Sequence, residues 1–165
     1  RGTLVELDWQ GNRLAEISLP DCSIGWFAAD DLDTNGEPDI CVLAQLASKE
    51  MVAAGISKAG RELWRHPISQ GVHHQQIEPV VAGNLFLEGP RQWLIATADG
   101  TIRVVGADGR LIESFAYGAE LTGMAAATWD GKPVLLVSTP GKVEAWHVEG
   151  PQKAAPPAPP APPAP

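Results

Sequence analysis

An acidic loop between two apolar stretches is the part of this sequence best suited to chemistry. Asp31, Asp33 and Asn35 alternate along it, and Gly36 follows directly. Alternate spacing in a tight loop lets the side-chain oxygens converge on one point, and glycine permits a sharp turn that a residue with a Cβ would resist. Oxygen-only ligands with several carboxylates suit a hard cation and favour calcium over zinc. The alternative is an ordinary Asn-Gly β-turn whose aspartates cap backbone amides, and the sequence leaves both open.

The histidines offer a second candidate metal site, with a weaker pattern. His73 and His74 are adjacent and His66 lies nearby. Adjacent residues of a strand point to opposite faces, so a satisfied pair in a loop is the default interpretation. The sequence contains no nucleophile elbow and no phosphate-binding loop, and glycosidase chemistry would need a second carboxylate held in a cleft. We therefore predict that the chain is not an enzyme and has no catalytic residue.

The residues around the acidic loop belong to a repeat. Gly11, Gly60 and Gly109 are spaced 49 residues apart, and each sits in the turn of a stretch that alternates apolar and polar residues. Such a stretch is typical of a β-hairpin. Between the hairpins we expect two further strands per repeat: 24–29 and 40–45, 77–82 and 93–97, and 123–128 and 134–139.

Four short strands per repeat of 40 to 50 residues are the mark of a β-propeller blade. The sequence thus predicts an all-β fold of four-stranded antiparallel blades, a partial propeller of about three blades. Half a blade is expected at 3–17 and an incomplete one at 123–148. A β-sandwich with coincidental spacing is the alternative, and the equal glycine spacing favours the propeller.

The domain is expected to span residues 1–150, and residues 151–165 differ from it entirely. Eight of the fifteen prolines in the chain lie in this last stretch. Proline lacks an N–H donor and fixes φ, so this sequence favours an extended polyproline II tail. A spacer is the plain interpretation, and a ligand for an aromatic-lined groove is the alternative.

Charge and composition narrow the classes of partner. The chain has 12 Lys and Arg against 20 Asp and Glu, a formal net charge of -8, which argues against nucleic acid and anionic lipid. No run of eighteen apolar residues is present, so we expect no membrane insertion. The chain begins with Arg1, as a processed product or a piece of a longer chain would. An open arc of blades would expose strand edges, so we expect a protein partner, a second copy or ring closure to cover them.

Residues 29–43, Ala-Asp-Asp-Leu-Asp-Thr-Asn-Gly-Glu-Pro-Asp-Ile-Cys-Val-Leu, resemble the integrin-type FG-GAP (VCBS-like) repeat. In that family an acidic loop joins two strands of a propeller blade and holds calcium. The resemblance implies a structural Ca²⁺ held by five residues: Asp31, Asp33, Asn35, Glu37 (through its carbonyl) and Asp39. The next blade keeps Gly89 and loses the acid pattern. An extracytoplasmic (periplasmic or extracellular) location also follows only from this resemblance.

Residues 57–64 resemble the turn of quinoprotein-type propeller repeats, in which a tryptophan packs between blades. We predict that function for Trp64, and packing in cores and between blades for most of the six tryptophans. The sequence thus favours a non-enzymatic structural or interaction module, a subunit or fragment of a larger assembly. A lobe of a propeller enzyme or ligand receptor, such as a quinoprotein-like dehydrogenase, is the alternative. Cys41 lies in an apolar run and is expected to be buried, and its pairing with Cys22 is left open.

Overall fold

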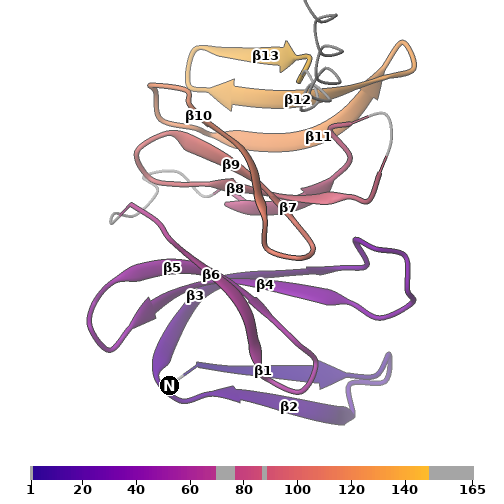
Figure 1. Cartoon of the computed structure of the whole chain (residues 1–165), viewed down its shortest axis with the longest axis vertical. Helices are drawn as coiled ribbons and strands as arrows, with labels where there is room; N and C mark the ends of the chain where they lie inside the picture. The colour runs from indigo at the N-terminus through magenta and orange to yellow at the C-terminus, as the bar shows by residue number, and fades with distance from the viewer. Residues whose placement is uncertain (1, 70–76, 87–88, 149–165) are drawn as a thin grey trace, which may run out of the picture.

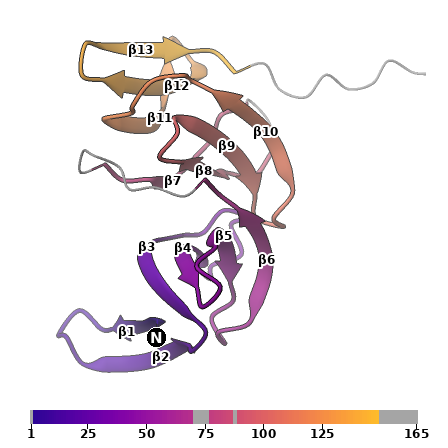
Figure 2. The same ribbon diagram turned by 90° about the vertical axis from the view of Figure 1, so that its left-hand side faces the viewer.

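The computed structural model describes residues 2–69, 77–86 and 89–148, which form antiparallel β-sheets stacked along an arc (Figures 1 and 2). A two-stranded sheet comes first, with β1 (Gly2–Leu7) and β2 (Arg13–Leu19). Two four-stranded sheets follow in chain order: β3 (Cys22–Asp30), β4 (Asp39–Leu46), β5 (Met51–Ile56) and β6 (Glu62–Pro67), then β7 (Val80–Gly83), β8 (Gln92–Ala96), β9 (Thr101–Gly106) and β10 (Leu111–Ala116). The last sheet has three strands, β11 (Gly123–Trp129), β12 (Lys132–Thr139) and β13 (Lys142–Trp146).

This arrangement confirms the prediction of an all-β fold built from propeller-like blades. Within each four-stranded sheet the strands pair in sequence order, as in a meander. The repeating glycines Gly11, Gly60 and Gly109 have φ values of 86°, 79° and 81° and turn equivalent hairpins. The β1–β2 hairpin therefore corresponds to the third and fourth strands of a blade.

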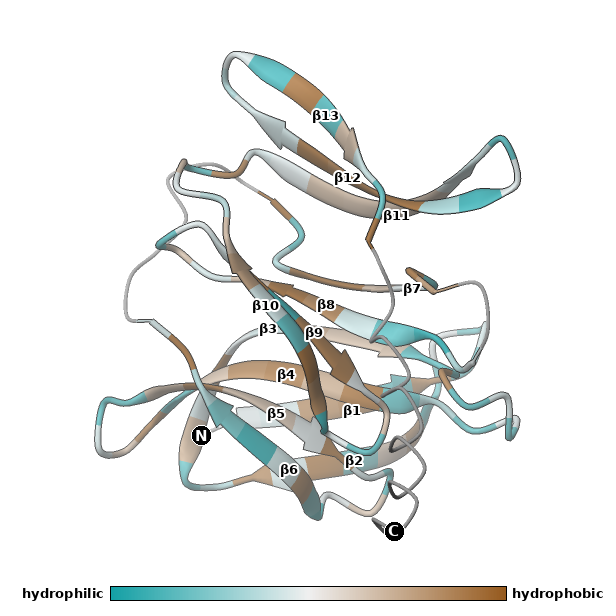
Figure 3. Ribbon diagram, turned by 45° about the horizontal axis from the view of Figure 1, so that its top comes forward, coloured by the Kyte–Doolittle hydropathy of each residue, from teal (hydrophilic) through white to brown (hydrophobic). Residues whose placement is uncertain are grey.

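The core lies between successive sheets, because each sheet presents alternate residues to its two neighbours. Val42 and Val52 pack toward the β1–β2 hairpin with Ile17. Leu43 and Ala53, on the opposite side of the same sheet, pack toward the next sheet. Figure 3 shows apolar colour along the central strands and polar colour at many turns.

Trp64 confirms its predicted packing between blades, whereas the prediction for most of the other tryptophans is wrong. A Cβ added to Gly55 would lie 2.1 Å from Nε1 of Trp64, and one added to Gly109 would lie 2.2 Å from its Cγ. The indole thus fills the space between two glycines of adjacent sheets. Trp93 is buried, but Trp9 is 91% exposed, and Trp26, Trp129 and Trp146 are exposed as well. Trp9 lies in a turn and Trp129 and Trp146 lie on the last sheet, whereas Trp26 lies on β3 of the first complete blade.

The remaining sequence expectations are met in part. The strand expected at 77–82 begins only at Val80. Cys41 is buried and Cys22 half-buried, and both are free thiols, so they do not pair. His73, His74 and the tail 151–165 lie outside the described residues. In the part of the chain that the structure describes, no helix is long and apolar enough to cross a membrane.

Candidate metal centre

The acidic loop joins the first two strands of the first complete blade. β3 ends at Asp30 and β4 begins at Asp39, and these two residues face each other in the antiparallel register. The eight residues between them therefore protrude from one end of the sheet. Asp31 and Asp39 are partly buried at the base of the loop, whereas residues 33–38 are exposed.

A single apolar residue anchors this polar loop. Leu32 is completely buried and packs in the core between two sheets. Its N–H donates to Oδ2 of Asp39 at 3.0 Å, and its carbonyl accepts from the N–H of Arg91 at 3.1 Å. The anchor fixes the positions of Asp31 and Asp33 on either side of it, and it orients Asp39 toward both.

The carboxylates of Asp31 and Asp33 also hold the turn. Asp31 accepts from the N–H of Asn35 at 3.0 Å and of Gly36 at 2.8 Å. Asp33 accepts from the N–H of Asn35 at 3.2 Å and from its side-chain Nδ2 at 3.0 Å. Gly36 has a φ of 87°, as the sequence predicted for a sharp turn, and Thr34 has a φ of 60°. The amide-capping geometry of the turn alternative is therefore present.

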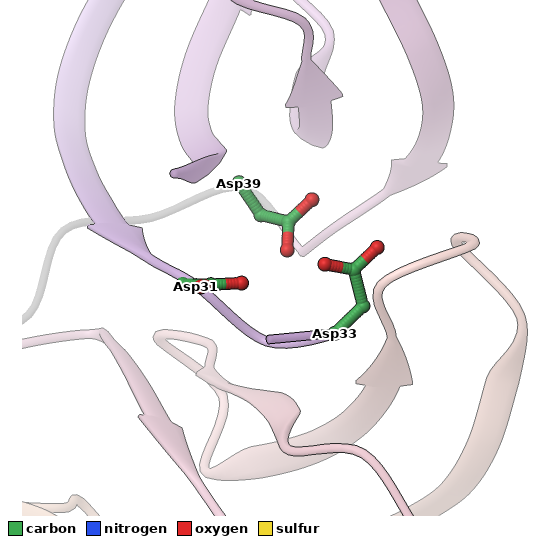
Figure 4. Close-up of side chains that lie close together, drawn as sticks. All are labelled: Asp31, Asp33 and Asp39. Atoms are coloured by element: carbon green, nitrogen blue, oxygen red, sulfur yellow. The ribbon is translucent and has the colours of Figure 1, made fainter. Parts of the chain in front are cut away.

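The same loop brings three carboxylates together. One oxygen from each of Asp31, Asp33 and Asp39 lies within 4.8 Å of the others, and Figure 4 shows the three side chains pointing toward one another. Their charges repel, and each oxygen has further lone pairs beside those used in the turn. Such an oxygen cluster can hold a metal ion, and its all-oxygen character suits a hard cation.

The electrostatics of the cluster are clearest at Asp39. Burial raises the pKa of this carboxyl, the hydrogen bond from the N–H of Leu32 opposes that rise, and the nearby negative charges of Asp33, Asp31 and Asp30 add to it. Each of these repulsions favours the protonated form in the absence of a cation. A bound divalent cation would reverse them.

Asn35 and Glu37 take turn positions. Oδ1 of Asn35 accepts from the N–H of Glu37 at 2.7 Å, so this amide oxygen is already engaged within the turn. Glu37 enters the hydrogen bonding of the loop through that N–H, and its side chain is exposed. The structure thus brings Asp31, Asp33 and Asp39 together, while a ligand role for Asn35 or for the carbonyl of Glu37 stays a prediction.

Arg91 is a neighbour of the site that sequence reasoning missed. It lies in the loop between β7 and β8, and its Nη1 forms an ion pair with Oδ1 of Asp30. Its Nη2 also donates to the carbonyl of Ala82 at 3.4 Å. Asp33, Asp39 and Arg91 line one cavity of about 1260 Å³ between the loops of adjacent blades, together with Asp108, Arg110 and Lys132. The cluster therefore opens onto a cavity with charges of both signs.

Comparison with known proteins supports the fold alone. No family model and no curated protein matches the sequence. Among solved structures, the chain is similar to BBS1N, a β-propeller solved in complex with ARL6DN, with a TM-score of 0.55 and 13% identity over 88% of this chain. The chain spans 44% of the length of that protein. It also resembles a protein of unknown function from Bacteroides caccae, with a TM-score of 0.42 and 15% identity over 79% of this chain and 44% of that one.

Proposed function

We propose that this chain is a non-enzymatic structural and interaction module, part of a larger propeller-type assembly, in which the loop 31–39 binds a structural calcium ion. The convergence of Asp31, Asp33 and Asp39 within 4.8 Å carries the calcium proposal. Calcium accepts six to eight oxygen ligands in flexible geometry, which a loop with backbone carbonyls and water can complete. Bound calcium would neutralise the repulsion among the carboxylates and fasten the ends of β3 and β4.

The interaction part of the proposal is supported by the fold comparison. BBS1N was solved with a protein bound to it, and blades present exposed turns suited to such contacts. The exposed calcium loop would suit an extracytoplasmic compartment, where modules bind calcium with dissociation constants of about 10⁻⁴ to 10⁻³ M. A protein partner is accordingly the class of ligand we assign to this module.

A calcium titration of thermal unfolding tests the metal site. Calcium should raise the thermal midpoint of the chain progressively, and at a free concentration of about one hundred times Kd the gain is about 2.7 kcal/mol. For a domain of this size that corresponds to a rise of several degrees. Asp33→Ala should abolish the rise, because it removes one of the three converging carboxylates.

Asp8→Ala is the matched control for this titration. Asp8 accepts from the N–H of Gln10 at 2.9 Å and of Asn12 at 2.8 Å, so it caps a turn as Asp31 does and carries the same charge. This variant should lower the midpoint and keep the full calcium increment. Identical melting curves for the unaltered chain in chelator and in calcium at about 100 mM, one hundred times the weakest expected Kd, would show that the loop is only a turn.

A further inference from the structure

The cavity of about 1260 Å³ beside the metal centre is lined by cations that the fold does not use. Most described Lys and Arg side chains pair with a carboxylate or a backbone carbonyl, as Arg91 does with Asp30. Arg110 and Lys132 both line this cavity. In the part of the chain that the structure describes, neither of these two side chains donates a hydrogen bond or forms an ion pair. Both cations are therefore available to a ligand.

The backbone that carries each of these two cations is fixed by contacts of its own. Arg110 follows Gly109 in the turn between β9 and β10, and Nε2 of His66, on the preceding blade, donates to the carbonyl of Gly109 at 2.7 Å. Lys132 begins β12, where it pairs with Trp129 across the tight turn from β11. A ligand would thus meet cations whose backbone is already in place, which lowers the entropic cost of binding.

The carboxylates that line the cavity have other roles. Oδ1 of Asp108 accepts from the backbone N–H of Arg110 at 3.0 Å and so caps the turn. Asp33 and Asp39 belong to the proposed calcium site, where a divalent cation would offset their charge. The net charge of -8 acts weakly at a distance, because the Debye length is about 8 Å at physiological ionic strength. The charges inside the cavity therefore decide which ligand it takes, and with calcium bound they favour an anion.

The size and the apolar lining of the cavity suit an extended segment of protein. Leu63 comes from the first complete blade, Phe86 and Ile112 from the second, and Pro133 from the last sheet, so the cavity crosses three sheets. Its volume exceeds the roughly 300–1,000 Å³ that is typical of small-molecule sites. A peptide with apolar side chains beside its acids would fill this space better than a compact organic anion. Residues 151–165 contain no Asp or Glu, so they cannot supply such acidic side chains.

We propose that this cavity binds an acidic segment of a protein partner, whose carboxylates pair with Arg110 and Lys132 and whose apolar side chains pack against the lining. The guanidinium of Arg110 can hold a carboxylate through two parallel hydrogen bonds, and the ammonium of Lys132 acts as a point charge. Calcium in the adjacent site tightens this binding, because it offsets the charge of Asp33 and Asp39 on the same cavity. The proposal rests on the proposed interaction function, and it names the surface and the chemistry of the partner.

A capped hexapeptide of alternating aspartate and leucine is the probe, and it is titrated by calorimetry into the full chain in calcium and in chelator. The matched peptide has asparagine in place of each aspartate, which keeps the shape and removes the charge. On the protein side, the double variant Arg110→Gln/Lys132→Gln is compared with Lys58→Gln/Arg61→Gln. Arg61 holds the same place in its hairpin as Arg110 does in the next one, so this control removes equal charge from an equivalent turn outside the cavity lining.

Saturable binding of the acidic peptide in calcium, with a Kd below about 1 mM, is the expected result. Each exposed charge pair contributes roughly two- to fivefold in affinity, so Arg110→Gln/Lys132→Gln should bind the peptide about five- to twentyfold more weakly. The control variant should bind it as the unaltered chain does, and the asparagine peptide should bind more weakly to both. Absence of saturable binding, equal binding of the asparagine peptide, or an equal loss in the control variant overturns the proposal.

Further outcomes separate this proposal from its rivals. Succinate bound as tightly as the hexapeptide would assign the cavity to a small organic acid, and self-association that Arg110→Gln/Lys132→Gln removes would assign it to a second copy; either overturns the proposal. Equal peptide affinity in calcium and in chelator, for a chain whose melting responds to calcium, would place the peptide away from the carboxylate cluster and overturn it as well. A positive calcium titration without peptide binding refutes the cavity and leaves the metal site, whereas peptide binding with a flat calcium titration refutes the metal site and leaves the pairing with Arg110 and Lys132.

Discussion

The loop between β3 and β4 and the loop between β7 and β8 are built on one frame and carry different chemistry. In the first, the N–H of buried Leu32 donates to Oδ2 of Asp39 at 3.0 Å. In the second, the N–H of buried Leu85 donates to Oε1 of Gln92 at 2.9 Å. Each leucine precedes its acceptor by seven residues. The frame is therefore a buried leucine tied to an acceptor at the start of the next strand.

The difference between the two loops separates the needs of the fold from those of the site. Gln92 is buried and neutral, and its Nε2 is also satisfied by the carbonyl of Pro90. In the second complete blade, a neutral amide thus accepts the leucine N–H and no charged group is needed. Asp39 performs the same task with a charge that burial and three neighbouring carboxylates disfavour. The first loop carries more negative charge than its frame requires, which is the physical reason to regard it as a cation site.

Truncation of either leucine should give the largest effect and show that the frame is shared. Leu32→Ala and Leu85→Ala each remove a buried side chain, and such changes cost about 2–5 kcal/mol. Urea denaturation in chelator measures both. The two losses should be similar, because both side chains fill the cores between sheets. A loss below about 1 kcal/mol for one of them would show that the two loops do not share an anchor.

Exchange of the two acceptor side chains, Asp39 and Gln92, should separate the effect of charge from the effect of the shared hydrogen bond. Asp39→Gln should leave the free energy of unfolding in chelator nearly unchanged or raised, and it should abolish the calcium increment. The reciprocal Gln92→Glu should cost about 1–3 kcal/mol, because it buries a carboxylate that gains no cation. It should confer no calcium response, since no acidic pair precedes it. Thermal unfolding with and without calcium checks both variants, and a calcium increment retained by Asp39→Gln would contradict the comparison.

The acidic half of this comparison was predictable from sequence, and the shared frame was not. Asp31, Asp33 and Gly36 are close in the chain, so local spacing decides their geometry and the turn follows from residue type. The frame joins each leucine to an acceptor seven residues later, a signal that is visible only when Leu32 and Leu85 are aligned by their blades. The two loops differ in the residues that lie between leucine and acceptor, so the alignment is not visible from the sequence alone.

Packing at the ends of the arc also escaped sequence reasoning. Trp93 and Trp129 both lie in apolar-rich strands, yet one is buried and the other exposed. The strand pattern specifies which face a side chain takes, and for Trp93 and Trp129 the position of the blade along the arc decides whether a neighbouring sheet covers that face. The repeat period predicted the number of strands per blade, because each period holds one equivalent hairpin turn and leaves room for two further strands.

The pH dependence of stability should differ between the two loops in chelator. The pKa of Asp39 is raised above its usual value of 3.8, so the folded state binds the proton more tightly than the unfolded chain does. The contribution of this group to stability is therefore fully present below the unfolded pKa and is lost as the pH rises through the folded pKa. Asp39→Gln should remove this component from a pH series of urea denaturation, while Gln92→Ala should leave it in place. An unchanged series in Asp39→Gln would show that Asp39 does not titrate in this way.

The smallest effect is expected where the two loops touch. Arg91→Gln removes the ion pair between Arg91 and Asp30. Both side chains are partly exposed, so the change should lower the free energy of unfolding by at most about 1 kcal/mol, and by less at high salt. The N–H of Arg91 that donates to Leu32 belongs to the backbone and remains. Because Asp30 lies beside the carboxylate cluster and loses its counter-charge, calcium should bind slightly more tightly in this variant at low salt. Arg110→Gln, which changes the net charge equally in the same cavity, should shift the affinity less. Calcium titrations at two salt concentrations measure this difference. Weaker calcium binding in Arg91→Gln would mean that Arg91 acts mainly by holding the loop in its binding conformation, and not by offsetting the negative charge of the loop.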